Sequence, residues 1–547
     1  MSGPSLIGGR SSILLLVAIV ISSPASGQRV EHPKGHEPAF QTSDRCIACH
    51  NGLTTPTGRD VSIGFDWRAS VMANSSRDPY WQASVRRETI DHRESQAAIE
   101  DECSVCHMPV TRYEAKLRGQ LGQVFSHLPF DADKKQGPQA EDGVDCSVCH
   151  QIGKEKLGTR ESFNGGFVID APASQNEHPE YGPFNIVHGN QHIMQTSTGG
   201  FRPTDDLHMR DSKLCATCHT LYTEARGPGG KVIGELPEQM PYPEWLHSDY
   251  RDKKSCQECH MPQVTEPAPI AKVLGVPREG LHQHVFVGGN FFLQRMLNRY
   301  RDDLGVKALP QELAAAADGT ITFLQSKSAR IAIDRVETGS ERLQAEVLVQ
   351  NLGGHKLPTA YPSRRVWLHL IVRDGDHRIV FESGALNADG SIQGNDNDAD
   401  PASFEPHYAE IDSRNQVEIY ESIMKDPAGH VTTGLLTAIG YLKDNRLLPC
   451  GFDKHTADKD IAVYGRAADD PNFVGGEDRV RYSVALGEAH GPFSIEAELW
   501  YQPIGYRWAN NLTSYNSASE PRRFNGYYDS MGPGTAVILA RTTAVTK

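Results

Sequence analysis

From about residue 328 to the C-terminus, apolar and polar residues alternate with a period of two. Gly, Asn and Asp turns separate the runs, and runs of this kind at this spacing predict an antiparallel β-sandwich over residues 328–547. The runs are ARIAIDRVE (329–337), RLQAEVLVQN (342–351), RVWLHLIVRD (365–374), HRIVFESG (377–384), DRVRYSVAL (478–486), FSIEAELWYQ (493–502) and TAVILART (535–542).

Before residue 328 the chain shows short helical patterns within segments rich in Gly, Pro and polar residues, such as YWQASVRRETIDH (80–92). Residues 291–327 predict two amphipathic helices, FFLQRMLNRYRDDL and PQELAAAADGTITFL, with Pro310 at the start of the second. We therefore expect an α+β multidomain chain. A mostly helical and loop domain covers residues 28–290, a helical connector covers 291–327, and the sandwich follows.

The N-terminus has the pattern of a secretory signal peptide over residues 1–27. Arg10 precedes the apolar run ILLLVAIVI (13–21), which is too short to span a bilayer, and Ala25 and Gly27 precede a cleavage site before Gln28. The pattern predicts a periplasmic or extracellular protein, with a retained N-terminal anchor as the alternative. The formal net charge of −14 and the scattered basic residues argue against a nucleic-acid partner.

Ten of the 11 cysteines fall in five copies of one pentapeptide: CIACH (46–50), CSVCH (103–107), CSVCH (146–150), CATCH (215–219) and CQECH (256–260). C-x-x-C-H is the attachment pattern of haem c: two thiols form thioethers with the haem, and the histidine binds its iron. A disulfide or zinc site would not require a histidine after every motif. The expected attachment residues are Cys46, Cys49, Cys103, Cys106, Cys146, Cys149, Cys215, Cys218, Cys256 and Cys259, with His50, His107, His150, His219 and His260 as iron ligands. Cys450 is expected to be a buried small hydrophobe.

The five motifs, with WRASVMA (67–73), YPEWLHSDY, CQECHMP and HQHVFVGGN (282–290), resemble bacterial multihaem c-type cytochromes. The group includes tetrahaem cytochrome c-554 and hydroxylamine oxidoreductase, and the resemblance covers about residues 40–290. It implies a pentahaem cytochrome domain over residues 28–290. Nitrite-reducing relatives carry one motif that ends in lysine, and none of the motifs here does. NLGGHKLPTAYPSRR (351–365) resembles C-terminal modules of other multihaem cytochromes.

Each iron needs a sixth ligand or leaves that site open, and 18 histidines lie outside the motifs. The candidates are His282 and His284 of the HQH pair, His247, His127 and His208, with hydrogen-bonded histidine as the alternative for each. In the group that the chain resembles, W-x-x-S-x-H-A often supplies this ligand. Met72 stands at that position, so we expect it either to bind the first or second haem, opposite His50 or His107, or to pack as core.

The C-terminal region offers two further sites. NADGSIQGNDNDADP (387–401) is dense in side-chain oxygens and suits a calcium ion, although it lacks an EF-hand pattern and a solvated acidic loop is the alternative. His355 and His407 could reach a haem, with a hydrogen-bonded structural role as the alternative.

Two functions fit these features. The first is an exported electron carrier that moves electrons along five haems to a redox partner protein or a membrane electron-transfer chain. The alternative is an oxidoreductase that acts on a small nitrogen or sulfur compound at one haem with an open site. The surplus of histidines over irons favours the carrier. No feature of the sequence fixes the oligomeric state.

Overall fold

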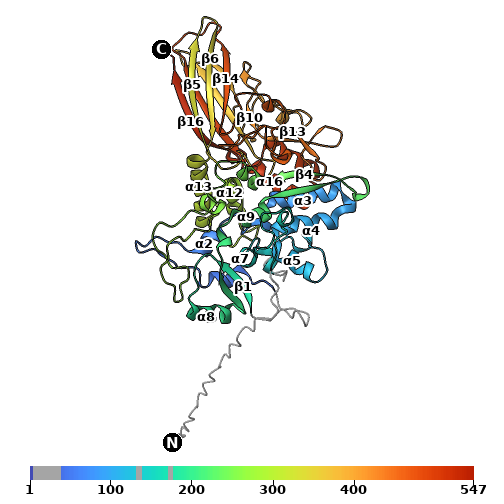
Figure 1. Ribbon diagram of the computed structural model, residues 1–547, viewed down its shortest axis with the longest axis vertical. Helices are drawn as coiled ribbons and strands as arrows, with labels where there is room; N and C mark the ends of the chain where they lie inside the picture. Colours follow the sequence, from blue (N-terminus) through green and yellow to red (C-terminus); the bar gives the residue numbers. More distant parts are fainter. Residues whose placement is uncertain (4–38, 131–137, 170–176, 547) are drawn as a thin grey trace. The chain divides into compact units, whose positions relative to one another are not determined.

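Helices dominate residues 39–327 and antiparallel sheets dominate the rest of the chain (Figure 1), which confirms the predicted α+β class. The computed structural model describes residues 1–3, 39–130, 138–169 and 177–546, so the predicted signal peptide falls almost wholly outside the described residues. The described residues from 39 to 546 belong to one compact unit. Within the described part, no helix combines the length and the apolar character needed to cross a membrane.

The helices before residue 291 are short. Five of them carry all or part of the C-x-x-C-H motifs: α1 (Ser43–Ile47), α4 (Gln96–His107), α7 (Cys146–Gln151), α9 (Ser212–His219) and α11 (Cys256–His260). The others are α2 (Ile63–Arg68), α3 (Pro79–Asp91), α5 (Pro109–Leu117), α6 (Pro138–Glu141), α8 (His188–Thr198) and α10 (Pro241–Leu246). Helix α3 matches the predicted helix at 80–92, and the Asp78 side chain caps it by accepting hydrogen bonds from the Tyr80 and Trp81 amides.

Two small sheets in this region were not predicted. Strands β1 (His178–Gly182) and β2 (Phe201–Asp205) pair in parallel, and β3 (Leu221–Arg226) and β4 (Val232–Gln239) form an antiparallel hairpin. Both pairs lie in loops between motifs, where they hold the chain that leads from one motif to the next.

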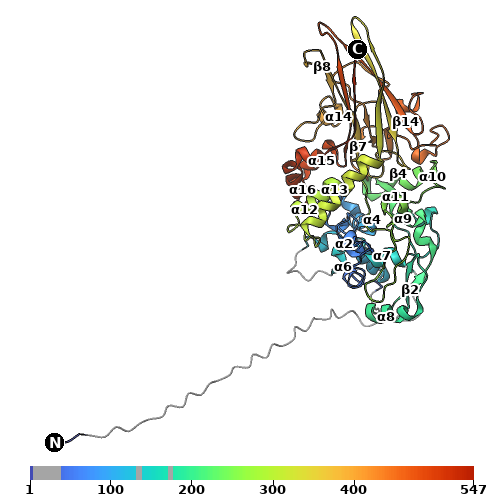
Figure 2. The ribbon, with the colours of Figure 1, turned by 90° about the vertical axis from the view of Figure 1, so that its left-hand side faces the viewer.

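The two helices predicted after residue 290 are present as α12 (Phe291–Arg299) and α13 (Pro310–Lys327). Helix α12 ends five residues before the predicted pattern does, and Pro310 occupies the first turn of α13 as expected. Helix α13 contacts α2 on one side and strands β5 and β16 on the other. Figures 1 and 2 accordingly show α12 and α13 between the motif helices and the large sheets.

All seven alternating runs form strands, and these belong to two larger sheets. One sheet has the order β5-β6-β14-β9, and the other has the order β10-β7-β15-β16 with β8 beside β7. The predicted strands are β5 (Ala329–Thr338), β6 (Arg342–Asn351), β7 (Arg365–Arg373), β8 (Ile379–Ser383), β14 (Glu477–Ala485), β15 (Ser494–Gln502) and β16 (Val537–Val545); β9 (Glu410–Ile411) and β10 (Ile419–Tyr420) are short additions. Alternate residues of β6 are buried, and apolar side chains of both sheets belong to one hydrophobic core.

The C-terminal region also departs from the predicted pattern. Strand β9 pairs with β14 in parallel, and a third sheet contains β11 (Ser422–Lys425), β12 (Val431–Thr432) and β13 (Gly440–Asp444). Helices α14 (Asp396–Ala399), α15 (Tyr506–Asn511) and α16 (Ser519–Ser530) interrupt the strands. Helix α16 packs on α3, and the Tyr80 and Phe524 rings lie 5.1 Å apart between them. The C-terminal region therefore contacts the motif-bearing part directly.

Candidate functional site

The C-x-x-C-H motifs lie on short helical turns. On a helix, residues three and four positions apart share one side, so the two cysteines and the histidine of each motif point to the same region. Side chains immediately before the motif helices fix where three of them begin: Asp145 caps α7, Asp211 caps α9, and Ser255 forms a capping box with Glu258 at α11. The local sequence thus supports the turn that the motif needs.

The motifs are distant in sequence but lie next to one another in the fold. The Cys46 side chain lies beside that of Cys146, the Cys106 side chain beside that of Cys218, and the Cys215 side chain beside that of Cys256. Cys149 lies near Cys218, which places the third motif beside the fourth. The motifs therefore form one contiguous array, in which the first meets the third, the third meets the fourth, and the fourth meets the second and the fifth.

Four of the five motif histidines use Nδ1 to hydrogen bond with a backbone carbonyl oxygen. The pairs are His50 with Ile270 (2.5 Å), His107 with Ser75 (3.0 Å), His150 with Tyr181 (2.6 Å) and His260 with Val287 (2.6 Å). A hydrogen bond at Nδ1 fixes the ring and leaves Nε2 for a metal, which is how histidine ligands are usually held. These side chains therefore fit the iron ligand of haem c.

All five motif histidines are kept neutral by their surroundings. Burial is the largest cause in every case: it lowers the pKa of His50, His150 and His219, and it lowers the pKa of His107 to about 4. Burial and the nearby His355 lower the pKa of His260 to about 4. A neutral imidazole retains the lone pair that binds a metal.

His284 of the HQH pair lies opposite the histidine of the third motif. The ring centres of His150 and His284 are 6.3 Å apart and their planes differ by 18°. Two imidazoles that bind one metal ion from opposite sides, at about 2 Å each, have ring centres about 6 Å apart. The His284 Nδ1 hydrogen bonds with the His282 carbonyl oxygen at 3.1 Å, so its Nε2 is free for such a bond.

The segment that carries the HQH pair is held against the fifth motif. The Val287 amide donates to the His260 carbonyl (3.0 Å), the Gln283 amide donates to the Pro262 carbonyl (3.0 Å), and the His282 Nδ1 hydrogen bonds with the Met261 carbonyl (2.6 Å). The segment therefore lies along the fifth motif and places the His284 ring opposite His150 of the third motif.

A second pair of rings has the same geometry. The ring centres of His260 and His355 are 6.1 Å apart and their planes differ by 9°. The His355 Nδ1 hydrogen bonds with the Lys356 carbonyl oxygen at 2.9 Å. His355 lies between β6 and β7 in the C-terminal region, where the sequence alone left a structural role open.

The remaining predicted histidines differ in their surroundings. The His208 Nε2 is bonded to the Ile152 carbonyl (2.8 Å) and the His247 Nε2 to the Asp453 carbonyl (3.1 Å), so in this arrangement neither presents that nitrogen to an iron. His127 keeps its place as a candidate, because the neighbouring Phe125 and Leu128 pack in one cluster with Cys103 of the second motif. Burial lowers the pKa of His127 as well.

Met72 lies close to two of the motifs through its backbone. The Met72 carbonyl accepts a hydrogen bond from the Val144 amide (3.0 Å), and the Trp67 indole donates to the Val144 carbonyl (3.1 Å), two residues before Cys146. Three residues after Met72, the Ser75 hydroxyl donates to the His107 carbonyl (3.0 Å). The WRASVMA segment is thus held between the second and third motifs.

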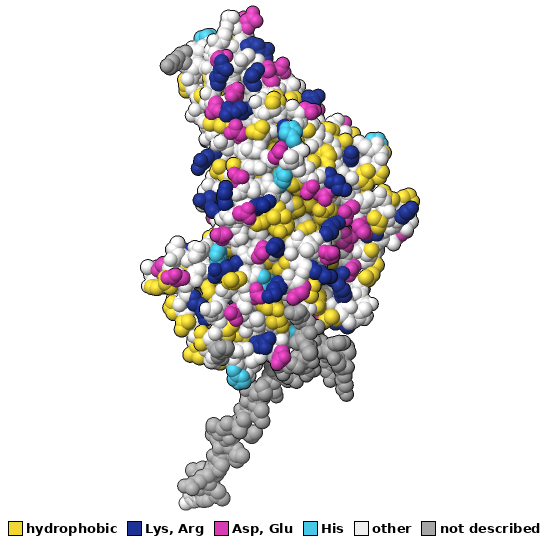
Figure 3. All heavy atoms as spheres, viewed as in Figure 1, with side chains coloured by type: hydrophobic (Ala, Val, Ile, Leu, Met, Phe, Trp, Pro, Cys, Tyr) yellow, Lys and Arg dark blue, Asp and Glu magenta, His cyan; other side chains and the backbone are white. Residues whose placement is uncertain are grey.

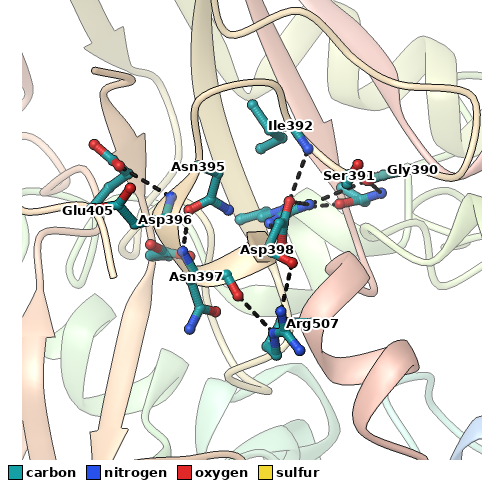
Figure 4. A network of polar contacts seen from close by, with 12 residues as sticks. Gly390, Ser391, Ile392, Asn395, Asp396, Asn397, Asp398, Glu405 and Arg507 are labelled. Atoms are coloured by element: carbon teal, nitrogen blue, oxygen red, sulfur yellow. Dashed lines mark hydrogen bonds and ion pairs between the residues drawn. The ribbon is translucent and has the colours of Figure 1, made fainter. Parts of the chain in front are cut away.

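In the loop proposed for calcium, polar side chains bond with other groups of the protein (Figure 4). Asp398 forms a two-point ion pair with the guanidinium of Arg365, at 2.8 and 2.9 Å, and accepts the Ile392 amide. Arg507 donates to the Asn397 and Asp398 carbonyls. The loop is partly buried rather than fully solvated, and its buried carboxylate, Asp398, is paired with an arginine.

Two other expectations in this region have clear outcomes. His407 hydrogen bonds with Glu418 (2.8 Å) and Asp470 (3.1 Å) through its two ring nitrogens, which is the structural role given as its alternative. Burial alone would lower the pKa of His407, but the charge of Glu418 and the bond to Asp470 raise it to about 10. The prediction that Cys450 is buried is wrong: its side chain is exposed, 3.7 Å from an Asp249 oxygen.

The surface shown in Figure 3 has acidic and basic side chains interspersed, with no continuous basic stripe on that face.

Comparison with known proteins shows a likeness in fold. No family model and no curated protein matches the sequence. The structure is similar to that of a penta-heme cytochrome c552 from Thermochromatium tepidum, with a TM-score of 0.51 and 15% identity over 93% of this chain and 100% of that chain. The chain therefore shares the fold of a multihaem cytochrome.

Proposed function

We propose that this protein is an exported electron carrier that holds five haems c in one array. The observation that carries the proposal is how the motif histidines are held: four of them hydrogen bond through Nδ1 with a backbone carbonyl, which leaves Nε2 for a metal, and each follows the second cysteine of its motif. Each haem would supply a one-electron iron couple. The likeness in fold to a penta-heme cytochrome supports the same assignment.

The arrangement of the motifs supports transfer between haems. Because each motif lies beside at least one other, the proposed haems would be close neighbours, and an electron that enters at one could leave at another. The polypeptide would fix the positions of the haems, bury the motif histidines and supply a second ligand to the irons.

The pairing of His150 with His284 favours a carrier over an enzyme at that site. An iron held by two histidines has no vacant position for a substrate, whereas the alternative function needs one haem with an open site. A redox partner protein or a membrane electron-transfer chain would exchange electrons with the array.

The test is reductive titration of the purified holoprotein with carbon monoxide added at the end. We expect five electron equivalents per chain and no carbon monoxide adduct in the reduced spectrum, because a carrier of this kind would hold every iron between two protein ligands. A stoichiometric adduct together with turnover of nitrite or hydroxylamine would instead establish the oxidoreductase and overturn the carrier.

A further inference from the structure

The loop between β6 and β7 reaches from the C-terminal sheets to the fifth motif. Tyr250, six residues before Cys256, donates its hydroxyl to the Leu352 carbonyl (3.0 Å). A side chain at Gly354 would lie 3.2 Å from both Trp245 and Tyr250, so the loop packs closely on this segment. His355 is the next residue after Gly354, where the loop approaches this segment closely.

The loop is held on both sides of His355. The Asn351 amide side chain donates to the His355 carbonyl (2.8 Å) and to the Leu447 carbonyl (2.9 Å). Lys356, which is 0% exposed, donates its amide to Glu244 (3.1 Å) and pairs its ammonium with Asp444 (2.8 Å). Such a buried ionic network fixes the backbone that carries the His355 ring.

The ring of His355 is oriented as a ligand and not as a structural histidine. Histidines with structural roles in this region bond both nitrogens to carboxylates, as His407 does with Glu418 and Asp470 and as His369 does with Glu498 and Glu382. His355 bonds Nδ1 to its neighbour's carbonyl, and its ring plane is nearly parallel to that of His260. This repeats the geometry of His150 with His284 at the third motif.

We propose that His355 is the sixth ligand of the haem at the fifth motif, opposite His260, so that the C-terminal sheet region completes one member of the array. The inference rests on the proposed function, because it requires a haem at Cys256 and Cys259. It gives the C-terminal region a direct part in the redox chemistry: the loop that joins its two large sheets sets the coordination of one iron.

The test uses the full-length holoprotein and three variants, His355→Ala, His355→Met and, as the matched control, His430→Ala, whose side chain is 77% exposed. In His355→Ala we expect one of the five haems to change from low spin to high spin in the electron paramagnetic resonance spectrum, with all five still attached. Added imidazole should restore the low-spin signal. In His355→Met one reduction potential should rise, because a thioether favours ferrous iron, and the control should match the wild type.

The outcomes separate the inference from the function on which it rests. Five attached haems with an unchanged spin state in His355→Ala would overturn the ligand assignment and leave the carrier intact. If His355→Ala does not fold, a His355→Met variant with unchanged potentials would overturn the assignment equally. A wild-type protein without attached haem would contradict the proposed function itself.

Discussion

A histidine that binds iron needs a fixed ring and one free nitrogen, and hydrogen bonds at Nδ1 provide both. The sequence shows which histidines adjoin a C-x-x-C pair but not where their Nδ1 protons go. The structure provides carbonyl partners at His50, His107, His150 and His260, and again at His284 and His355. At the residue scale, this shared pattern distinguishes the proposed ligands from His208 and His247.

The pairing of His284 with His150 predicts the effect of removing one ring. In His284→Ala we expect one low-spin haem to become high spin, because the iron at the third motif loses its sixth ligand. The measurement is electron paramagnetic resonance of the oxidised holoprotein. His247→Ala serves as the control, since its Nε2 is bonded to the Asp453 carbonyl. Spectra in which only the control changes would reverse this assignment.

A separate prediction concerns whether the Met72 thioether binds a haem iron. If its thioether binds the haem opposite His50 or His107, Met72→Ala should abolish the weak far-red band of His/Met ligation and create one high-spin haem. Met72→His should lower one potential, because imidazole favours ferric iron more than a thioether does. An unchanged absorption spectrum in Met72→Ala would show that the side chain only packs in the core.

At the scale of elements, buried ion pairs hold the C-terminal loops to the sheets. Arg365 at the start of β7 pairs with Asp398 in α14, and both side chains are buried. A chelator such as EGTA should therefore leave the melting temperature unchanged. Asp398→Ala should cost about 3–5 kcal/mol, because it leaves a buried guanidinium unpaired.

The matched control for this pair is Asp389→Ala in the same loop, where the carboxylate is exposed and bonds only to Ser391 among the contacts described. An exposed substitution of this kind should change stability by less than about 0.5 kcal/mol. A melting temperature that falls with EGTA would instead establish a bound cation in the loop.

His407 gives the C-terminal region a dependence on pH. Glu418 before β10, Asp470 and, further off, Asp478 in β14 face the ring, and together they raise its pKa to about 10. The pKa is raised on folding, so the stabilisation is complete below about pH 6.5, the usual histidine pKa, and is lost as the pH rises through 10.

Urea unfolding at pH 7 and pH 10 measures this effect by comparison with His407→Gln. The variant should lose on the order of a few kcal/mol at pH 7, because Glu418 and Asp470 stay buried without their counter-charge. The two proteins should approach each other in stability at pH 10. A constant difference between them at both pH values would show that the charge of His407 contributes nothing.

The sequence predicts elements better than contacts between them. Strands β6 and β15 begin and end within about a residue of the predicted runs, because burial on one face imposes period two on a strand. Helix α16 was missed, since its polar pattern is stabilised by packing on α3 rather than by its own periodicity. The partner of His260 was left open for the same reason, because the loop of His355 reaches it only through tertiary packing.

At the scale of the whole molecule, the motifs form an array whose order differs from the sequence. The first motif meets the third and the fourth meets the second and fifth, so neighbours in the chain are not always neighbours in space. In the contacts described, the first motif meets the third, whereas the second and the fifth each meet the fourth. These three motifs are therefore the ends of the array. We expect electrons to enter or leave at these outer members.

The proposed carrier holds a haem at each of its five motifs, and the haem content of the mature protein measures this directly. Made in a host with haem-attachment machinery, the protein should give five haems per chain by the pyridine haemochrome assay, and all should stay with the polypeptide in acidified acetone. Three or fewer haems per chain, with motif cysteines still open to alkylation, would contradict the assignment of five haem sites.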